Sequence, residues 1–212
     1  MVGTGEKLSR LYLEALRAGD GPGAYRIVSG ALAEGMDLPA LYQQIVAPAM
    51  HEIGALWETG ALPIADEHRA TELTNRVLAA LRPPPGADLG GEDLPHGRAL
   101  LATIEGERHA LGLRMASDIL EERGFETIYL GADVPTGTLL QAIAVTAPDL
   151  VALAATMPEL APRLEVVAAA VREAHPEVEL LLGGQAASPR VGGTLVESFE
   201  LLPERLLPRS QV

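Results

Sequence analysis

The chain has 212 residues, with 16 Lys and Arg against 29 Asp and Glu, so its formal net charge at pH 7 is −13. This acidic balance argues against direct binding of nucleic acid. The absence of cysteine excludes a disulfide framework, a thiolate metal site and a thioether-linked chromophore. With neither a long apolar run nor a signal peptide, we expect a soluble, cytoplasmic protein that binds no membrane.

A stretch rich in proline and glycine divides the chain. Residues 83–97 begin with three consecutive prolines and lack a hydrophobic period, a composition that cannot continue a helix. We therefore predict a helical domain over residues 1–82, a linker over residues 83–97 and a second domain over residues 98–212.

Apolar residues recur at helical spacing throughout the first domain. The pattern predicts helices around residues 8–16 and 24–32, a third over residues 37–57 and a fourth over residues 63–82. The third helix contains Pro48, where we expect a kink. Four helices joined by short loops favour an antiparallel four-helix bundle.

Beyond the linker, short apolar runs alternate with helical segments. Strands are predicted at residues 99–104, 125–130, 150–155 and 178–182, with helices at residues 111–123, 136–147 and 162–174. Uniformly apolar strands separated by helices indicate a parallel sheet covered on both faces. The fold class is therefore α/β, with a flavodoxin-like (Rossmann-like) domain after the bundle. Residues 188–212 are expected to form a loop with a short helix.

The segment after the first strand is the first place to look for a ligand, because ligands bind beyond the carboxyl ends of parallel strands. It contains Glu107, His109 and Gly112. An imidazole can bind a metal through one ring nitrogen while a nearby carboxylate accepts a proton from the other and fixes the ring. The glycine would let a large flat group approach the backbone. A solvated loop histidine beside a glutamate is the alternative.

Three spaced elements resemble the cobalamin-binding domain family, whose pattern is Asp-x-His-x-x-Gly, then Ser-x-Leu or Ser-x-Thr, then Gly-Gly. The matching residues are Glu107, His109, Gly112, Ala154, Thr156, Gly183 and Gly184, and the segment that ends in Val134 and Pro135 also looks like the family's. Glu107 stands where the family has Asp, and Ala154 where it has Ser.

The resemblance implies that His109 is the lower axial ligand of cobalt and displaces the cofactor's own dimethylbenzimidazole. The nucleotide tail would then enter a slot lined by Ala154, Thr156, Gly183 and Gly184. Glu107 should still hold His109, whereas Ala154 removes one hydroxyl from the slot. The alternative is a flavodoxin-like domain that binds no cobalamin.

The bundle carries a second set of candidate residues. The spacing of Trp57, Glu67 and His68 resembles the light-sensing regulators of the CarH type, in which these residues cap the adenosyl group of adenosylcobalamin. The alternative is that Trp57 is a core residue and Glu67 favours a helix N-terminus. The regulators have a histidine next to the tryptophan that becomes the upper ligand after illumination. Here that residue is Glu58, which leaves water, His51 or His68 for the role.

The resemblance implies a sensor rather than an enzyme, and no dehydrogenase, NTPase, hydrolase or zinc-protease motif is present. We expect a stand-alone photoreceptor that binds adenosylcobalamin between bundle and sheet domain. It would signal to an unidentified partner protein through a light-induced change of conformation or homo-oligomeric state. The regulators carry a DNA-binding domain ahead of the bundle, whereas the first helix here begins at once, so we expect no contact with DNA.

Three further possibilities remain open. The single-domain photocobilins have a similar architecture and also bind biliverdin, which would have to be noncovalent here. A corrinoid methyl carrier of a methyltransferase system pairs the same two domains, although a bulky Trp57 argues against its open upper face. A light-independent cobalamin sensor or antirepressor would need the same site.

Overall fold

The computed structural model describes residues 3–82, 97–188 and 192–202. The chain separates into two compact units, Met1–Leu89 and Gly90–Val212. The predicted linker, residues 83–97, lies outside the described residues except for Gly97, which begins the first strand. No helix in the described ranges is long and apolar enough to cross a membrane.

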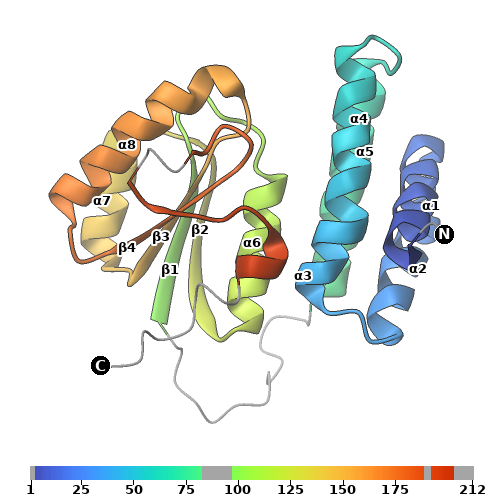
Figure 1. Ribbon diagram of the computed structural model, residues 1–212, viewed down its shortest axis with the longest axis horizontal. Helices are drawn as coiled ribbons and strands as arrows, with labels where there is room; N and C mark the ends of the chain where they lie inside the picture. The colour runs from blue at the N-terminus through green and yellow to red at the C-terminus, as the bar shows by residue number, and fades with distance from the viewer. Residues whose placement is uncertain (1–2, 83–96, 189–191, 203–212) are drawn as a thin grey trace. The chain divides into compact units, whose positions relative to one another are not determined.

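The first unit consists of helices (Figure 1). Its elements are α1 (Thr4–Ala18), α2 (Gly21–Ala33), α3 (Leu38–Leu41), the π-helical turn η1 (Tyr42–Val46), α4 (Ala47–Glu58) and α5 (Ile64–Leu81). Asp20 and Asp37 start two of these helices, because each side chain accepts a backbone N–H three residues later at 2.8 Å. The predicted helical N-terminal region is confirmed, with its third helix divided into α3, η1 and α4.

A kink was predicted at Pro48, and the structure has a π-helical turn, Tyr42–Val46, just before it. Proline has no N–H, and its ring crowds the carbonyl of Gln44 four residues earlier. The wider turn relieves this crowding, with the Ala47 N–H donating to the Tyr42 carbonyl. The buried Ser9 hydroxyl donates to the Ile45 carbonyl at 3.0 Å. The third helix is therefore bridged to α1 where its regular hydrogen bonding is interrupted.

One buried polar chain crosses the core of the helical unit. The Tyr12 hydroxyl donates to Thr74 Oγ1 at 3.2 Å, and the Thr74 hydroxyl lies 3.3 Å from Met50 Sδ. Tyr12 and Thr74 are fully buried. Burial raises the pKa of Tyr12 to about 12, against a smaller lowering by the bond to Thr74.

The second unit is a five-stranded parallel sheet of order β2-β1-β3-β4-β5. Its elements are β1 (Gly97–Ile104), α6 (Leu111–Glu122), β2 (Phe125–Val134), α7 (Thr136–Thr146), β3 (Leu150–Ala154), α8 (Ala161–Ala174), β4 (Glu179–Gly183) and β5 (Thr194–Leu195), with a 3₁₀ turn η2 (Pro158–Leu160) before α8. This strand order is the doubly wound, flavodoxin-like one. The predicted α/β class is confirmed.

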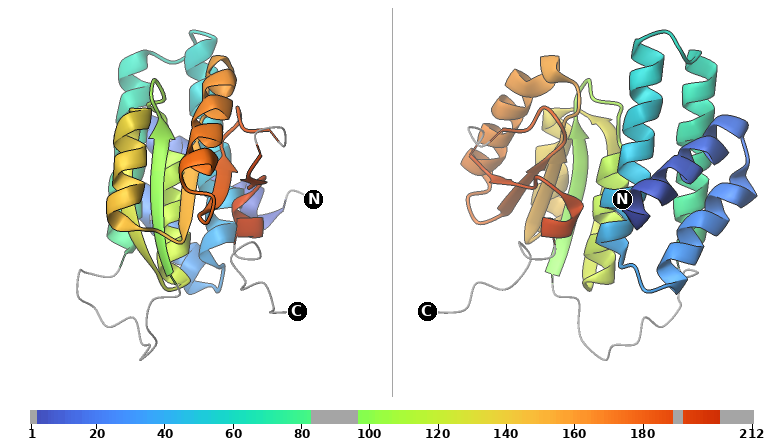
Figure 2. Two further views of the ribbon diagram at one scale, coloured as in Figure 1. Left: turned by 90° about the vertical axis from the view of Figure 1, so that its left-hand side faces the viewer. Right: turned by 45° about the vertical axis from the view of Figure 1, so that its right-hand side comes forward.

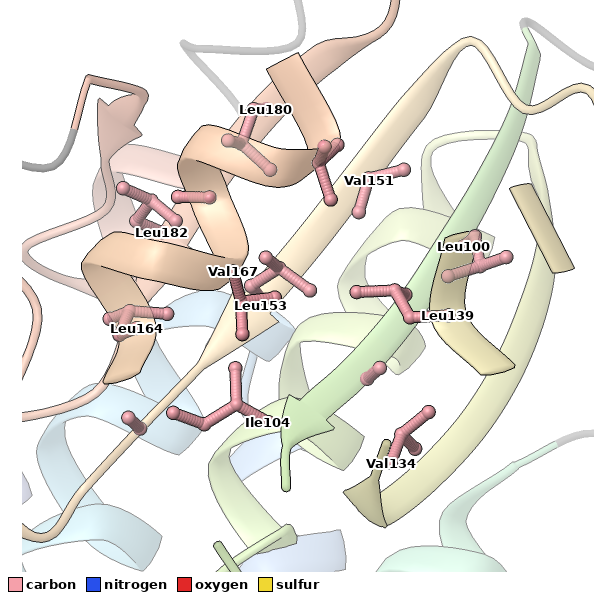
Figure 3. Packing of buried hydrophobic residues seen from close by; sticks show 14 of the residues in the cluster. Leu100, Ile104, Val134, Leu139, Val151, Leu153, Leu164, Val167, Leu180 and Leu182 are labelled. Atoms are coloured by element: carbon pink, nitrogen blue, oxygen red, sulfur yellow. The ribbon is translucent and has the colours of Figure 1, made fainter. Parts of the chain in front are cut away.

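Helices cover both faces of this sheet, α7 and α8 on one and α6 on the other (Figures 1 and 2). On the α7 and α8 face, alternate strand residues such as Leu100, Ile104 and Leu153 pack against Leu139 and Leu164 (Figure 3). Because strand side chains alternate between faces, the intervening strand positions point to the α6 side. This alternation decides which strand residues can face a ligand on that side.

Two parts of the sheet differ from the prediction. Strand β2 continues past residue 130 to Val134, because its pairing with β1 shifts twice near Ala102 and Gly131 adopts a φ of +85°. Strand β5 was not predicted, since two residues give no readable period. The expected short helix near the C-terminus is a 3₁₀ turn, Phe199–Leu201.

Candidate functional site

The carboxyl ends of three neighbouring strands meet in register. Thr103 on β1 pairs with Ala154 on β3, and Ala154 pairs with Gly183 on β4. All three positions alternate with residues of the α7 and α8 core, so they share the α6 face of the sheet. The structure thus brings the two small residues of the predicted slot, Ala154 and Gly183, side by side.

Glu107 occupies the loop after β1 and is completely buried. Its Oε1 accepts the backbone N–H of His109 at 2.8 Å and lies 2.5 Å from His109 Nδ1. Its Oε2 accepts the backbone N–H groups of Thr156, at 2.6 Å, and Met157, at 3.0 Å. Burial alone would raise the pKa of Glu107, but these donors outweigh it and hold the pKa below its ordinary value. The carboxylate is therefore ionised at neutral pH.

The Glu107 carboxylate holds one edge of the His109 ring and leaves the opposite edge without a contact to that carboxylate. Its side chain is 54% exposed, and Nδ1 faces the Glu107 carboxylate. An imidazole that donates Nδ1–H to a carboxylate carries a lone pair on Nε2, which lies on the opposite edge of the ring. The contact with Glu107 therefore orients the ring so that Nε2 lies on the edge away from the carboxylate.

Two residues that the sequence did not single out hold the same loop. The buried Thr103 hydroxyl donates to the Glu107 carbonyl at 2.6 Å and accepts the Asp133 N–H at 3.0 Å. Asp133 has a left-handed φ of +57°, and its carboxylate accepts the Gly106 N–H at 2.7 Å. A polar residue inside an otherwise apolar strand was the available signal for Thr103. Met157 contributes only a backbone N–H, for which the sequence has no signal.

The predicted glycines fall into two kinds. A Cβ added at Gly184 would lie 2.2 Å from the Ala155 carbonyl oxygen, and Gly184 has a φ of +90°. The fold itself therefore requires glycine there. A Cβ at Gly112 or Gly183 would meet no neighbouring atom within 4 Å. Packing within the described chain does not demand glycine at these two positions, which leaves room for a ligand.

The other predicted residues at this edge contribute less. The Val134 side chain is buried in the core on the α7 face, beside Ile104 and Leu139 (Figure 3). Pro135 is the exposed N-cap of α7. The structure thus places Pro135 at the strand end and directs the Val134 side chain into the core.

The bundle residues lie beside the short turn between α4 and α5. Trp57, in the last turn of α4, is 40% exposed and so is not a core residue. In the first turns of α5, the Glu67 carboxylate accepts the Thr71 hydroxyl at 2.9 Å and lies 2.6 Å from His68 Nδ1. His68 remains largely exposed. The tryptophan and the Glu67–His68 pair therefore lie at the same end of the helical unit.

The other candidate histidine, His51, and Glu58, which replaces the regulators' histidine, both lie on α4. His51 is exposed and precedes Trp57 by six residues, which is about 9 Å along a helix. Glu58 is exposed and directly follows Trp57. Of the two candidate histidines, only His68 lies at the same end as Trp57.

Within the described residues, no group of three or more His, Asp or Glu side chains could hold a bare metal ion. A single histidine can serve as a metal ligand when the metal brings its other ligands with it, as in a macrocycle. His109 therefore fits a metal cofactor better than a free ion.

Two stretches of the chain match B12 binding domain families, one over residues 8–82 and the other over residues 97–197. The first stretch lies in the helical unit, and the second contains the His109 loop and the strand ends beside it. The chain is therefore a cobalamin-binding protein of the B12 binding domain families.

Among proteins of known role, the chain resembles the HTH-type transcriptional repressor CarH of Myxococcus xanthus. The two are 30% identical over 176 residues, which is 82% of this chain and 56% of the repressor. A trimethylamine corrinoid protein of Methanosarcina acetivorans is 28% identical over 134 residues, 63% of this chain and 62% of that protein. The chain thus spans less than two thirds of either relative.

A solved structure shares the fold. The monomethylamine corrinoid protein of Methanosarcina barkeri superposes with a TM-score of 0.77 at 18% identity, covering 95% of this chain and 97% of that chain. This likeness supports the fold assignment.

Proposed function

We propose that the chain is a light sensor that binds adenosylcobalamin. The observation that carries this proposal is Trp57, the single tryptophan, which is 40% exposed at the end of the helical unit that also carries Glu67 and His68. Tryptophan is enriched at interfaces, because its large apolar ring also carries one polar N–H. The similarity to the CarH repressor supports the same assignment.

The sheet domain carries the proposed cobalt ligand and the proposed nucleotide slot. His109 binds cobalt through Nε2, and Glu107 fixes the ring from the other edge. The open positions at Gly112 and Gly183 fit a large group that approaches the backbone. Ala154, Thr156, Gly183 and Gly184 line the slot for the nucleotide tail, and Pro135 lies at the neighbouring strand end.

The helical unit contributes the response to light. Bound adenosylcobalamin supplies a cobalt–carbon bond that light breaks. In our proposal, Trp57, Glu67 and His68 would hold the adenosyl group and would lose these contacts when the group leaves. Lost packing of that kind destabilises a protein by up to several kcal/mol, on the order of 24 cal/mol per Å³ of cavity. The helices respond by repacking or by a change of oligomeric state, which a separate partner protein detects.

A second candidate function is a methyl carrier for a methyltransferase. The similarity to the trimethylamine corrinoid protein favours it. A carrier must offer the upper face of its corrinoid to other proteins, so Trp57 should then be dispensable for the choice of upper ligand. A light-independent cobalamin sensor would use the same lower site.

Absorption spectra of the protein with adenosylcobalamin, before and after green light, separate these functions when combined with size-exclusion chromatography. A light sensor changes both spectrum and size, and Trp57→Ala reduces its preference for adenosylcobalamin over methylcobalamin. Tyr25→Ala, which removes a similarly exposed aromatic from α2, is the matched control. Equal acceptance of methylcobalamin without a size change would favour the carrier, and new red absorption with biliverdin would identify a second chromophore.

A further inference from the structure

The two oxygens of Glu107 serve two different loops. Oε1 holds His109, two residues along the chain, whereas Oε2 holds the N–H groups of Thr156 and Met157, 49 and 50 residues away. The proposed cobalt ligand and the turn that lines the nucleotide slot are therefore joined through one buried carboxylate.

Both ends of this connection are fixed. The Glu107 N–H donates to the Ile104 carbonyl at 2.9 Å. The Glu107 backbone carbonyl accepts the Thr103 hydroxyl and the Asp133 N–H. On the other side, Ala155, just before Thr156, is tied to the loop after β4. Its N–H donates to the Gly183 carbonyl at 3.1 Å, and its carbonyl accepts the Ala186 N–H at 3.0 Å.

The length of the glutamate decides whether both loops can be reached. Aspartate is shorter by one carbon–carbon bond, about 1.5 Å, and hydrogen bonds weaken steeply beyond their normal range. His109 lies in the same short loop and can follow a shorter side chain. The turn at Thr156 cannot follow, because Ala155 is anchored to the next strand end. Aspartate would thus keep the histidine contact and lose the turn.

We propose that Glu107 is a positioning residue that couples His109 coordination to occupancy of the nucleotide slot. This inference rests on the proposed binding of cobalamin. A tail that contacts Thr156 acts on the Glu107 carboxylate through the N–H groups that Oε2 accepts, and the carboxylate acts on the imidazole through Oε1. Coupling of this kind is reciprocal, so coordination by His109 strengthens tail binding by the same factor.

The connection is testable without any cofactor. Backbone amide exchange of Thr156 and Met157 should be about tenfold faster in Glu107→Asp than in the natural chain, since each loses one hydrogen bond. Glu105→Asp makes the same chemical change at an exposed residue of the same loop and should leave both rates unchanged. Equal protection in Glu107→Asp would overturn the proposal.

The coupling itself is tested with adenosylcobalamin and with adenosylcobinamide, which lacks the nucleotide tail. The fraction of cobalt bound by His109, measured from the absorption spectrum, should be higher with the tail than without it in the natural chain and in Glu105→Asp. In Glu107→Asp this advantage should shrink by at least about fivefold. An unchanged advantage would overturn the coupling alone. Failure of the natural chain to bind either corrinoid would overturn both the coupling and the proposed function.

Discussion

The two units bury polar groups in different settings. In the helical unit, the buried hydroxyls of Ser9 and Thr74 bond to other helices and stabilise the packing of the bundle. In the sheet unit, Thr103 and Glu107 bond to loops at the strand ends and hold His109 in place. A buried polar group in the first unit thus supports the fold, whereas these two support the proposed site.

The same difference appears in how the two units should respond to pH. Burial raises the pKa of Tyr12, so that the neutral hydroxyl is the form the bundle stabilises. Hydrogen-bond donors overcome burial at Glu107 and lower its pKa, so that the anion is stabilised. The helical unit should therefore be sensitive to alkali at Tyr12, and the sheet unit to acid at Glu107.

The largest effect is expected at Glu107. Glu107→Ala leaves the N–H groups of His109, Thr156 and Met157 without their acceptor. An unsatisfied buried donor costs about 1–3 kcal/mol and a part-buried one less, so the free energy of unfolding of the sheet unit should fall by about 2–4 kcal/mol in urea at pH 7. A loss below about 1 kcal/mol would mean that the carboxylate does not hold the two loops.

The acid response of Glu107 provides a second check on the same residue. Its folded pKa lies below the ordinary 4.5, so its contribution is fully present above about pH 4.5 and disappears as the pH falls through the folded value. Glu107→Ala should show a flatter loss of stability over that acid range than the natural chain. Parallel curves for the two proteins would contradict the assignment.

The paired glycines should respond unequally. Gly184→Ala forces a left-handed residue with a Cβ against the Ala155 carbonyl, and the left-handed conformation alone costs roughly 1–2 kcal/mol. Gly183→Ala has open space and should leave the melting temperature unchanged while weakening cobalamin binding. Equal stability losses in both variants would contradict the assignment of Gly183 to the slot.

An intermediate effect is expected at Thr103. Thr103→Val removes the hydroxyl that joins the Glu107 carbonyl to the Asp133 N–H and should cost about 2 kcal/mol. Thr103→Ser keeps the hydroxyl and should therefore lose less stability than Thr103→Val. The stability that it still loses would come from the missing methyl group. Urea denaturation of the two variants measures the difference, and identical losses would show that the hydroxyl has no role.

The smallest effect belongs to the helical unit. Tyr12→Phe removes the hydroxyl bonded to Thr74 and should cost about 1 kcal/mol. The contribution of Tyr12 is present below its ordinary pKa of 10.0 and is lost as the pH rises through about 12. The variant should therefore lose less stability than the natural chain between these values in alkaline denaturation. Cobalamin binding should be unaffected.

The sequence predicted what depends on local pattern. Helical spacing identified the bundle, uniform apolar runs identified four of the strands, and the Glu107–His109 spacing identified the strand end where the loop is built. Strand β5 escaped because it is two residues long and is defined by its pairing with Leu181 and Leu182. Pro48 signals an irregular helix, but the sequence does not show that the irregularity is a π-helical turn whose Ile45 carbonyl accepts the Ser9 hydroxyl from another helix.

Several features of the site depend on where the backbone lies, and the identity of the side chains does not reveal that. The bonds from Glu107 to Thr156 and Met157 use main-chain N–H groups, which no residue type announces. Gly183 and Gly184 look identical in sequence, yet the fold requires only Gly184. Val134 was expected at the cofactor, but strand alternation turns its side chain toward the core. These details depend on three-dimensional packing.

The central claim is that His109 binds cobalt from below. Electron paramagnetic resonance of the protein with cob(II)alamin, with histidine labelled in ¹⁵N, tests it directly, because the axial nitrogen splits the cobalt lines. If His109 is the ligand, labelling changes each line from a triplet to a doublet, and His109→Ala abolishes the change. A triplet that persists with labelled histidine would show that the cofactor's own base remains bound, and would contradict the account.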